Sequence, residues 1–109
     1  MKLKFPKKIM IGSAEFLIEK NPEIAGGDFT YCNKGKKGKI TIGTKHLKSS
    51  PTRVLETIIH ELKEVIQVEQ SVRYQRLDLE EGEYLFSYGH KDHTDLCSRL
   101  AGLLNYFID

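Results

Sequence analysis

The sequence contains few cysteines, and the two that occur do not form a recognisable pair. Cys32 and Cys97 lie far apart in 109 residues and lack the close spacing of a metal-binding motif. Reduced thiols in a cytoplasmic protein are the simplest account of them. We therefore expect no stabilising disulfide.

Long apolar segments are also missing. No stretch approaches the roughly 20 consecutive apolar residues that a helix needs to cross a bilayer. The basic opening MKLKFPKK is not followed by the uninterrupted apolar stretch of a signal peptide. We expect neither secretion nor membrane insertion, and a cytoplasmic location.

Internal repeats and low-complexity tracts are absent as well, and the composition is that of a folded protein. Hydrophobic residues make up 39% of the chain and charged residues 29%. A chain of 109 residues is large enough for one hydrophobic core and too small for two. We therefore expect a single domain over residues 1–109.

The net charge of +2 conceals an asymmetry between the two halves of the chain. Residues 1–50 carry 11 lysines and 4 acidic residues, whereas residues 51–109 carry 6 basic and 11 acidic residues. The first half could attract anions, but lysines also solvate the turns and edges of a sheet, and no aromatic platform for bases accompanies them. We do not expect nucleic acid to be the main partner.

Four strands are predicted before any helix. Apolar and polar residues alternate on either side of residues 12–13, which predicts two short strands joined by a turn, the second ending at residues 21–22. Residues 28–32 and 39–44 are rich in β-forming side chains, and residues 33–38 between them suit a hairpin. We expect these strands to pair antiparallel.

Two amphipathic helices are predicted in the second half. Ser50 and Pro51 favour a helix start, with the hydroxyl as N-cap and the proline at the first position, where its missing N–H costs nothing. The apolar stripe of this helix comprises Leu55, Ile58, Ile59, Leu62, Val65 and Ile66. Another strand is expected at residues 84–88. After Asp92, the apolar residues Leu96, Leu100, Leu103, Leu104 and Phe107 predict a last helix.

These elements predict an α+β domain. It would consist of a small antiparallel sheet, a first helix that bears the candidate site, and a C-terminal helix.

The first helix contains the candidate site in the segment TIIHELKEVI, residues 57–66. His60 and Glu64 are four residues apart, so they project from one helix face and can offer an imidazole nitrogen and a carboxylate oxygen to one zinc ion. Glu61 is rotated by about 100° from His60, so we expect it to act on a water at the ion as a general base rather than as a ligand. A solvated local pair on the polar face of the helix is the structural alternative.

A zinc site needs a third protein ligand. The remaining histidines are His46, His90 and His93. His46 has no evident reason to converge on the helix. His90 and His93 lie between the expected strand and the last helix, a junction that can fold back over the first helix.

The segments VLETIIHELKEVI, RYQR and YLFSYGHKDHTDLCSRLAGLL resemble a group of small phage and prophage proteins with a zincin-like, minimal metallopeptidase pattern. In that group an HExxE or HExxH motif is followed by a strand that ends in a histidine. The resemblance covers residues 51–104 well and the first strands only loosely. It implies zinc bound by His60, Glu64 and His90, with His93 as the second choice. If a phage encodes the protein, the expected location is the host cytoplasm.

Three functions follow as hypotheses. The first is a zinc-dependent hydrolase, a metallopeptidase that acts on a peptide or protein substrate with Glu61 as the proton carrier. The second is a non-catalytic protein that keeps the zincin scaffold for interaction or metal binding. The third is an anion or nucleic-acid binder that uses the lysine cluster Lys34, Lys36, Lys37 and Lys39.

Overall fold

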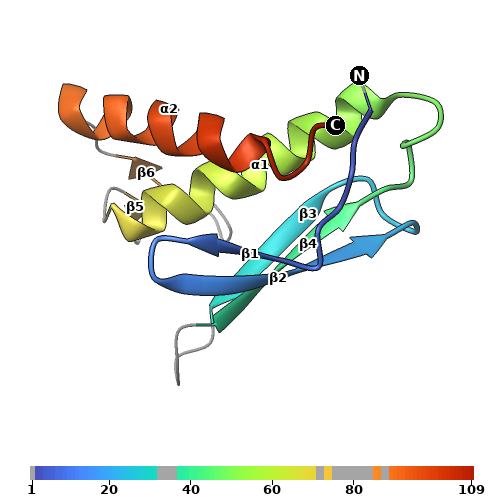
Figure 1. Cartoon of the computed structure of the whole chain (residues 1–109), viewed down its shortest axis with the longest axis horizontal. Coiled ribbons are helices and arrows are strands. Elements are labelled where there is room, and N and C mark those ends of the chain that lie inside the picture. The colour runs from blue at the N-terminus through green and yellow to red at the C-terminus, as the bar shows by residue number, and fades with distance from the viewer. Residues whose placement is uncertain (1, 32–36, 71–72, 75–84, 87–88) are drawn as a thin grey trace.

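The computed structural model describes residues 2–31, 37–70, 73–74, 85–86 and 89–109. Four strands come first, followed by a long helix, two short strands and a last helix (Figure 1). The elements are β1 (Lys8–Ile11), β2 (Ala14–Asn21), β3 (Gly27–Tyr31), β4 (Lys37–Gly43), α1 (Pro51–Glu69), β5 (Arg73–Tyr74), β6 (Leu85–Phe86) and α2 (His90–Leu104). The predicted α+β class is confirmed.

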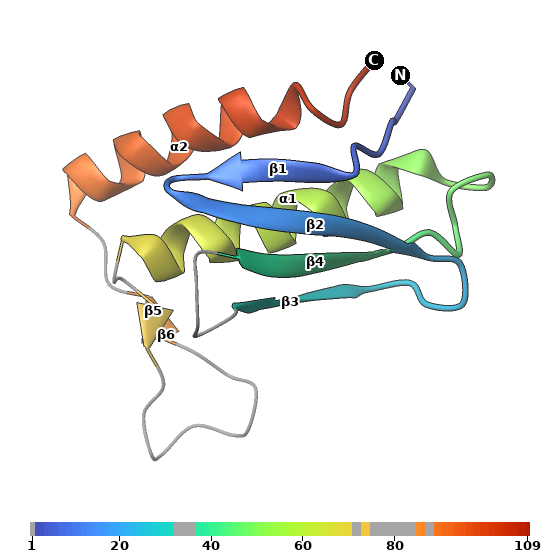
Figure 2. The same ribbon diagram turned by 60° about the horizontal axis from the view of Figure 1, so that its bottom comes forward.

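The main sheet is mixed, in contrast to the antiparallel sheet that the sequence predicts. Its strand order is β1-β2-β4-β3, and β2 pairs with β4 in parallel while the other neighbours are antiparallel (Figure 2). The parallel pair arises because the β3–β4 hairpin returns with β4 against β2, which leaves β3 on the outside. Local sequence patterns do not encode which strand of a hairpin faces its neighbour.

The predicted turn between the first two strands is confirmed. Gly12 has a φ of 61°, a left-handed conformation that glycine adopts without the Cβ penalty of other residues. This allows β1 and β2 to pair directly, with Ile11 opposite Ala14.

The first helix begins at Pro51, as predicted, but the expected N-cap bond is not formed. Ser50 is the N-cap residue, and its side chain makes no capping hydrogen bond. The first turn of α1 also contains no acidic residue. The positive end of the helix dipole is therefore not neutralised within its own first turn.

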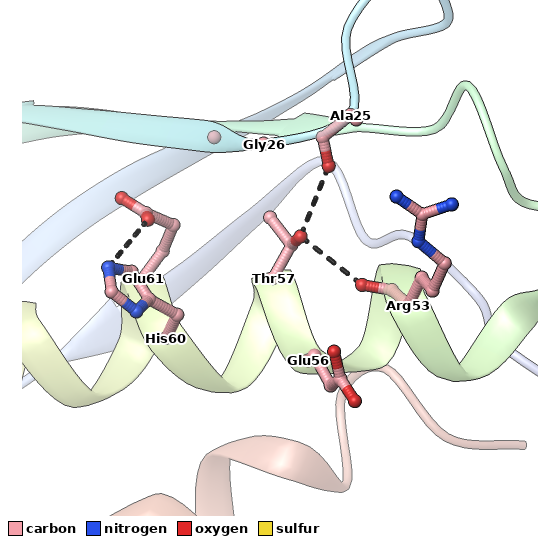
Figure 3. A pocket seen from close by; sticks show the side chains of 8 residues that line it. Ala25, Gly26, Arg53, Glu56, Thr57, His60 and Glu61 are labelled. Carbon is pink, nitrogen blue, oxygen red and sulfur yellow. Dashed lines mark hydrogen bonds and ion pairs between the residues drawn. The ribbon is translucent and has the colours of Figure 1, made fainter.

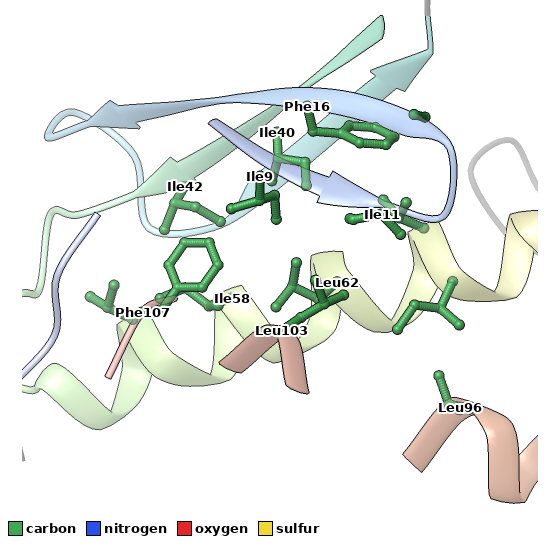
Figure 4. Packing of buried hydrophobic residues seen from close by; sticks show 14 residues of the cluster. Ile9, Ile11, Phe16, Ile40, Ile42, Ile58, Leu62, Leu96, Leu103 and Phe107 are labelled. Atoms are coloured by element: carbon green, nitrogen blue, oxygen red, sulfur yellow. The ribbon is translucent and has the colours of Figure 1, made fainter. Parts of the chain in front are cut away.

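Both helices lie on one face of the four-stranded sheet, and the hydrophobic core fills the space between the sheet and the helices (Figures 1 and 4). Phe16, Ile40 and Ile42 of the sheet are fully buried against Ile58 and Leu62 of α1. The other buried members of this core are Ile9, Ile11, Ala14, Val54, Val65, Ile66, Leu96, Leu103 and Phe107.

The buried face of α1 differs from the predicted stripe in a way that concerns the site. Leu55 and Ile59 are only partly buried, whereas Val54 and the charged Glu61 are buried. The stripe is thus rotated toward Glu61, which places this carboxylate at the border between the core and the polar face.

The second half of the chain contains two short strands. Arg73 and Tyr74 pair antiparallel with Phe86 and Leu85, so a strand lies within residues 84–88 as predicted, while the other residues of that prediction lie outside the described part. The last helix begins at His90, before the expected Asp92. Among the described residues, neither helix is long and apolar enough to cross a membrane.

Candidate metal centre

Three side chains of α1 form a compact group of potential metal ligands. One donor atom from each of His60, Glu61 and Glu64 lies within 4.8 Å of the other two. The His60 Nε2 atom is 2.7 Å from Glu64 Oε2 and 3.8 Å from Glu61 Oε2. We call these three residues the donor cluster.

Glu61 lies closer to His60 than its place on the helix suggests, while its expected role as a general base stays a prediction. A rotation of about 100° separates it from His60 on the helix, but its flexible side chain brings the carboxylate back toward the imidazole. Glu61 therefore lies within reach of a shared ion, either as a ligand or beside a water on that ion.

Glu61 is buried because the start of β3 lies directly over it. A Cβ atom built on Gly27 would lie 3.3 Å from Glu61 Cγ, 3.1 Å from Thr57 Cγ2 and only 2.5 Å from the backbone oxygen of Thr41. The absence of a side chain at Gly27 thus lets the strand approach the helix closely. This approach leaves only 5% of the Glu61 side chain exposed.

The other two members of the donor cluster are more open. The His60 side chain is 67% exposed and that of Glu64 is 17% exposed. The cluster therefore lies at the boundary between the protein interior and the solvent, so a bound ion would remain accessible to water.

A cleft of about 420 Å³ adjoins the cluster, between α1 and the start of β3 (Figure 3). One wall comes from residues 25–27, and the helix contributes Arg53, Glu56, Thr57, His60 and Glu61. Such a volume lies within the usual range of small-ligand sites.

Thr57 ties the two walls of this cleft together. Its hydroxyl lies 3.3 Å from the carbonyl oxygen of Ala25 and 3.3 Å from that of Arg53, and it can donate to either (Figure 3). Donation to Ala25 holds the segment before β3 against the helix.

The atoms of the donor cluster are of the types that bind zinc, and the distances between them are close to those of a zinc site. Imidazole nitrogen and carboxylate oxygen are both ordinary zinc ligands, and two ligands of one tetrahedral zinc lie about 3.4 Å apart. The 2.7 Å between His60 and Glu64 is a hydrogen-bond distance. Zinc binding would require these two atoms to separate by about 0.7 Å, which small side-chain rotations can supply.

The structure does not bring the expected third ligand into the donor cluster. His90 is the exposed first residue of α2, and His93 lies one turn further along the same helix. This end of α2 is held near the end of α1, where Gln70 Nε2 donates to the Asp92 carbonyl oxygen at 2.8 Å. Gln70 is ten residues beyond His60, about 15 Å along the helix axis. The role of His90 stays a prediction.

His93 and His46 have other surroundings. His93 Nε2 is 3.7 Å from the Cys97 Sγ atom on the next turn of α2. His46 lies in the segment between β4 and α1, where its carbonyl accepts a hydrogen bond from the Ser50 backbone N–H. Within the described residues, neither joins the donor cluster.

The lysine cluster of the third hypothesis is only partly described. Lys34 and Lys36 lie outside the described residues. Lys37 and Lys39 belong to β4, and Lys39 Nζ is 3.6 Å from Glu19 Oε2. The positive charge of Lys39 is therefore partly compensated by a neighbouring carboxylate.

Two other polar residues of α1 have notable positions that the sequence motifs do not indicate. Arg53 lines the cleft, and its spacing of four from Thr57 and eight from Glu61 is a helical signal that could have indicated it. Gln67 is only 2% exposed, and its Oε1 atom makes no hydrogen bond within the described part of the chain. No sequence signal distinguishes this glutamine from a surface residue.

Comparison of the chain with protein-family models, curated proteins and solved structures finds no match. The resemblance to zincin-like phage proteins accordingly depends on the motif residues alone.

Proposed function

We propose that this protein is a zinc-dependent hydrolase, a metallopeptidase of the minimal zincin type as in phages and prophages. The observation that carries the proposal is the donor cluster: His60, Glu61 and Glu64 offer three ligand atoms within 4.8 Å of one another. Two of these residues, His60 and Glu61, also line a cleft of about 420 Å³. The proposed location is the cytoplasm.

The residues have distinct roles in this proposal. His60 and Glu64 hold the zinc, together with His90 as the third protein ligand. When bound, the zinc would polarise a substrate carbonyl and make a bound water more acidic. Glu61 would take a proton from the attacking water and pass it to the leaving amine. Its burial beside His60 supports this role, because a carboxylate with little competing water interacts more strongly with a nearby proton donor.

A peptide or protein is the proposed substrate because of the strand that borders the cleft. β3 is the outer strand of the four-stranded sheet, and its first residue, Gly27, lines the cleft. An extended peptide can pair with the edge of such a strand, whereas a compact small molecule gains nothing from it.

One observation favours a non-catalytic alternative. The 2.7 Å contact between His60 and Glu64 satisfies both groups without a metal ion. A zincin scaffold that serves for interaction or metal binding alone would have the same fold and the same side-chain pair.

Metal analysis and a cleavage assay test the proposal. Protein purified without a histidine tag should contain about one zinc per chain, and the zinc-loaded form should cleave a mixture of unfolded proteins. Zinc without cleavage would leave the non-catalytic alternative. The absence of zinc would reject both the zinc-dependent hydrolase and a scaffold that binds metal.

A further inference from the structure

The cleft has a chemically distinct end that the proposed reaction does not use. His60 and Glu61 of the donor cluster lie at one end, and Arg53 lies at the other, in the first turn of α1 (Figure 3). His60 comes seven positions after Arg53, which is about 10 Å along a helix axis. The two ends are thus separated by the length of about three residues of extended peptide.

Arg53 is available for a ligand. Its side chain is exposed, and within the described residues it takes part in no ion pair. Glu56 is the nearest acidic residue on the helix that lines the cleft. In Figure 3 its carboxylate points away from the strand side, whereas the Arg53 guanidinium extends toward that side.

The position of Arg53 in the helix adds to its attraction for anions. A basic residue in the first turn opposes the helix dipole, so it does not stabilise α1. No acidic residue in that turn and no side-chain N-cap bond offsets the positive end of the dipole. The guanidinium and the helix terminus therefore both favour a negative group at this end of the cleft.

The charges of the donor cluster complement this arrangement. Glu61 and Glu64 give the cluster two negative charges when ionised, and a bound divalent ion neutralises them. With the metal in place, Arg53 and Glu56 are the charged helix residues that remain at the cleft, and the Glu56 carboxylate points away from its strand side (Figure 3).

We propose that Arg53 forms an anion subsite of this cleft, which binds the carboxylate of a peptide whose carbonyl lies at the donor cluster about 10 Å away. The inference rests on the proposed metal-dependent function. The carboxylate can be the C-terminus of the peptide or the side chain of an aspartate or glutamate in the corresponding position.

Three synthetic hydroxamates test the subsite on the zinc-loaded protein. Each carries a metal-binding hydroxamate followed by a three-residue spacer: one ends in Gly with a free carboxylate, one in Gly amide and one in Asp amide. Calorimetry gives their dissociation constants. At least one of the two carboxylate probes should bind about tenfold more tightly than the Gly amide probe. Tighter binding of the probe with the free Gly carboxylate indicates recognition of a peptide C-terminus, and tighter binding of the Asp amide probe indicates recognition of an acidic side chain.

Substitution of Arg53 should remove this preference. In Arg53→Gln all probes should bind with the affinity of the Gly amide probe, while the midpoint of thermal unfolding should stay the same or rise, because a charge that opposes the dipole is lost. Lys63→Gln is the matched control. It removes one positive charge from an exposed position of α1 that does not line the cleft, and it should keep the preference.

The outcomes separate the two proposals. Equal affinity of the wild type for all three probes would overturn the anion subsite and leave the metal site intact. The same conclusion follows if Arg53→Gln keeps the preference. Failure of every probe to bind would overturn the proposed function, and the subsite with it.

Discussion

The Nε2 atom of His60 lies 2.7 Å from the Oε2 atom of Glu64, one turn further along α1. As a helix-stabilising pair this arrangement is weak. The acidic partner follows the basic one, which is the less favourable order relative to the helix dipole, and such pairs contribute about 0.2 to 0.5 kcal/mol at best. The pair also lies beside the buried carboxylate of Glu61, and the two carboxylates repel each other when both are ionised. A divalent ion shared by the three groups would relieve this repulsion.

His60→Ala should therefore abolish zinc binding, because it removes the only nitrogen of the donor cluster. Metal content after dialysis, measured by mass spectrometry, is the readout. His46→Ala is the control, since His46 lies before the helix and outside the cluster, and it should keep about one zinc per chain. Equal metal content in the two variants would contradict the assignment.

Gly27→Ala should disturb the site through the fold. The added Cβ would lie 2.5 Å from the Thr41 backbone oxygen, which cannot move freely because β4 is paired on both sides. We expect a loss of about 1 to 3 kcal/mol in the free energy of unfolding, together with weaker zinc binding. Denaturant unfolding and a zinc titration measure the two effects.

Gly26→Ala provides the control for this change. Gly26 also lines the cleft, but an added Cβ there meets no atom within 4 Å. Its stability and zinc affinity should stay close to those of the wild type. If both alanine variants behave alike, close approach at Gly27 is not what positions Glu61.

The donor cluster was accessible to sequence analysis because its geometry is local. The spacing of His60 and Glu64 determines that they share a helix face, whatever the rest of the chain does. The burial of Glu61 was not accessible, because it depends on Gly27, which comes from a strand 34 positions earlier. The parallel pairing of β2 with β4 is likewise a long-range choice, made by the packing of one hairpin against another.

The third ligand is a prediction of the same long-range kind. His90→Ala should weaken zinc binding by about tenfold or more, and His93→Ala by less, if the start of α2 approaches the donor cluster when zinc binds. Competition with a chromogenic chelator gives both affinities. The opposite order would assign the ligand to His93, and unchanged affinity in both would show that the third ligand lies elsewhere.

Substitution of Gln67 should raise the stability of the fold, in contrast to Gly27→Ala, which should lower it. Its buried Oε1 atom has no hydrogen-bond donor within the described residues, and burial without a partner costs about 1 to 3 kcal/mol. Gln67→Leu keeps a similar volume without that oxygen, so it should raise the free energy of unfolding by about 1 kcal/mol. Leu62→Ala, at a fully buried position on the same helix, should lower it by about 3 kcal/mol. A destabilised Gln67→Leu variant would indicate that the amide has a partner in the folded protein.

The last prediction concerns the chemistry of Glu61 and Glu64. Glu61→Gln fills the same space but cannot accept a proton, so it should bind zinc like the wild type and lose most activity against unfolded proteins. A loss of zinc in this variant would instead identify Glu61 as a ligand, which its 3.8 Å distance from His60 Nε2 allows.

Glu64→His replaces an anionic ligand with a neutral one, so the bound water becomes more acidic and any hydrolysis should rise while the zinc is retained. Because Glu64 makes the wild type a slow catalyst on this account, the comparison must be made at matched zinc content. No cleavage by the wild type or by Glu64→His would reject the peptidase and leave the non-catalytic scaffold.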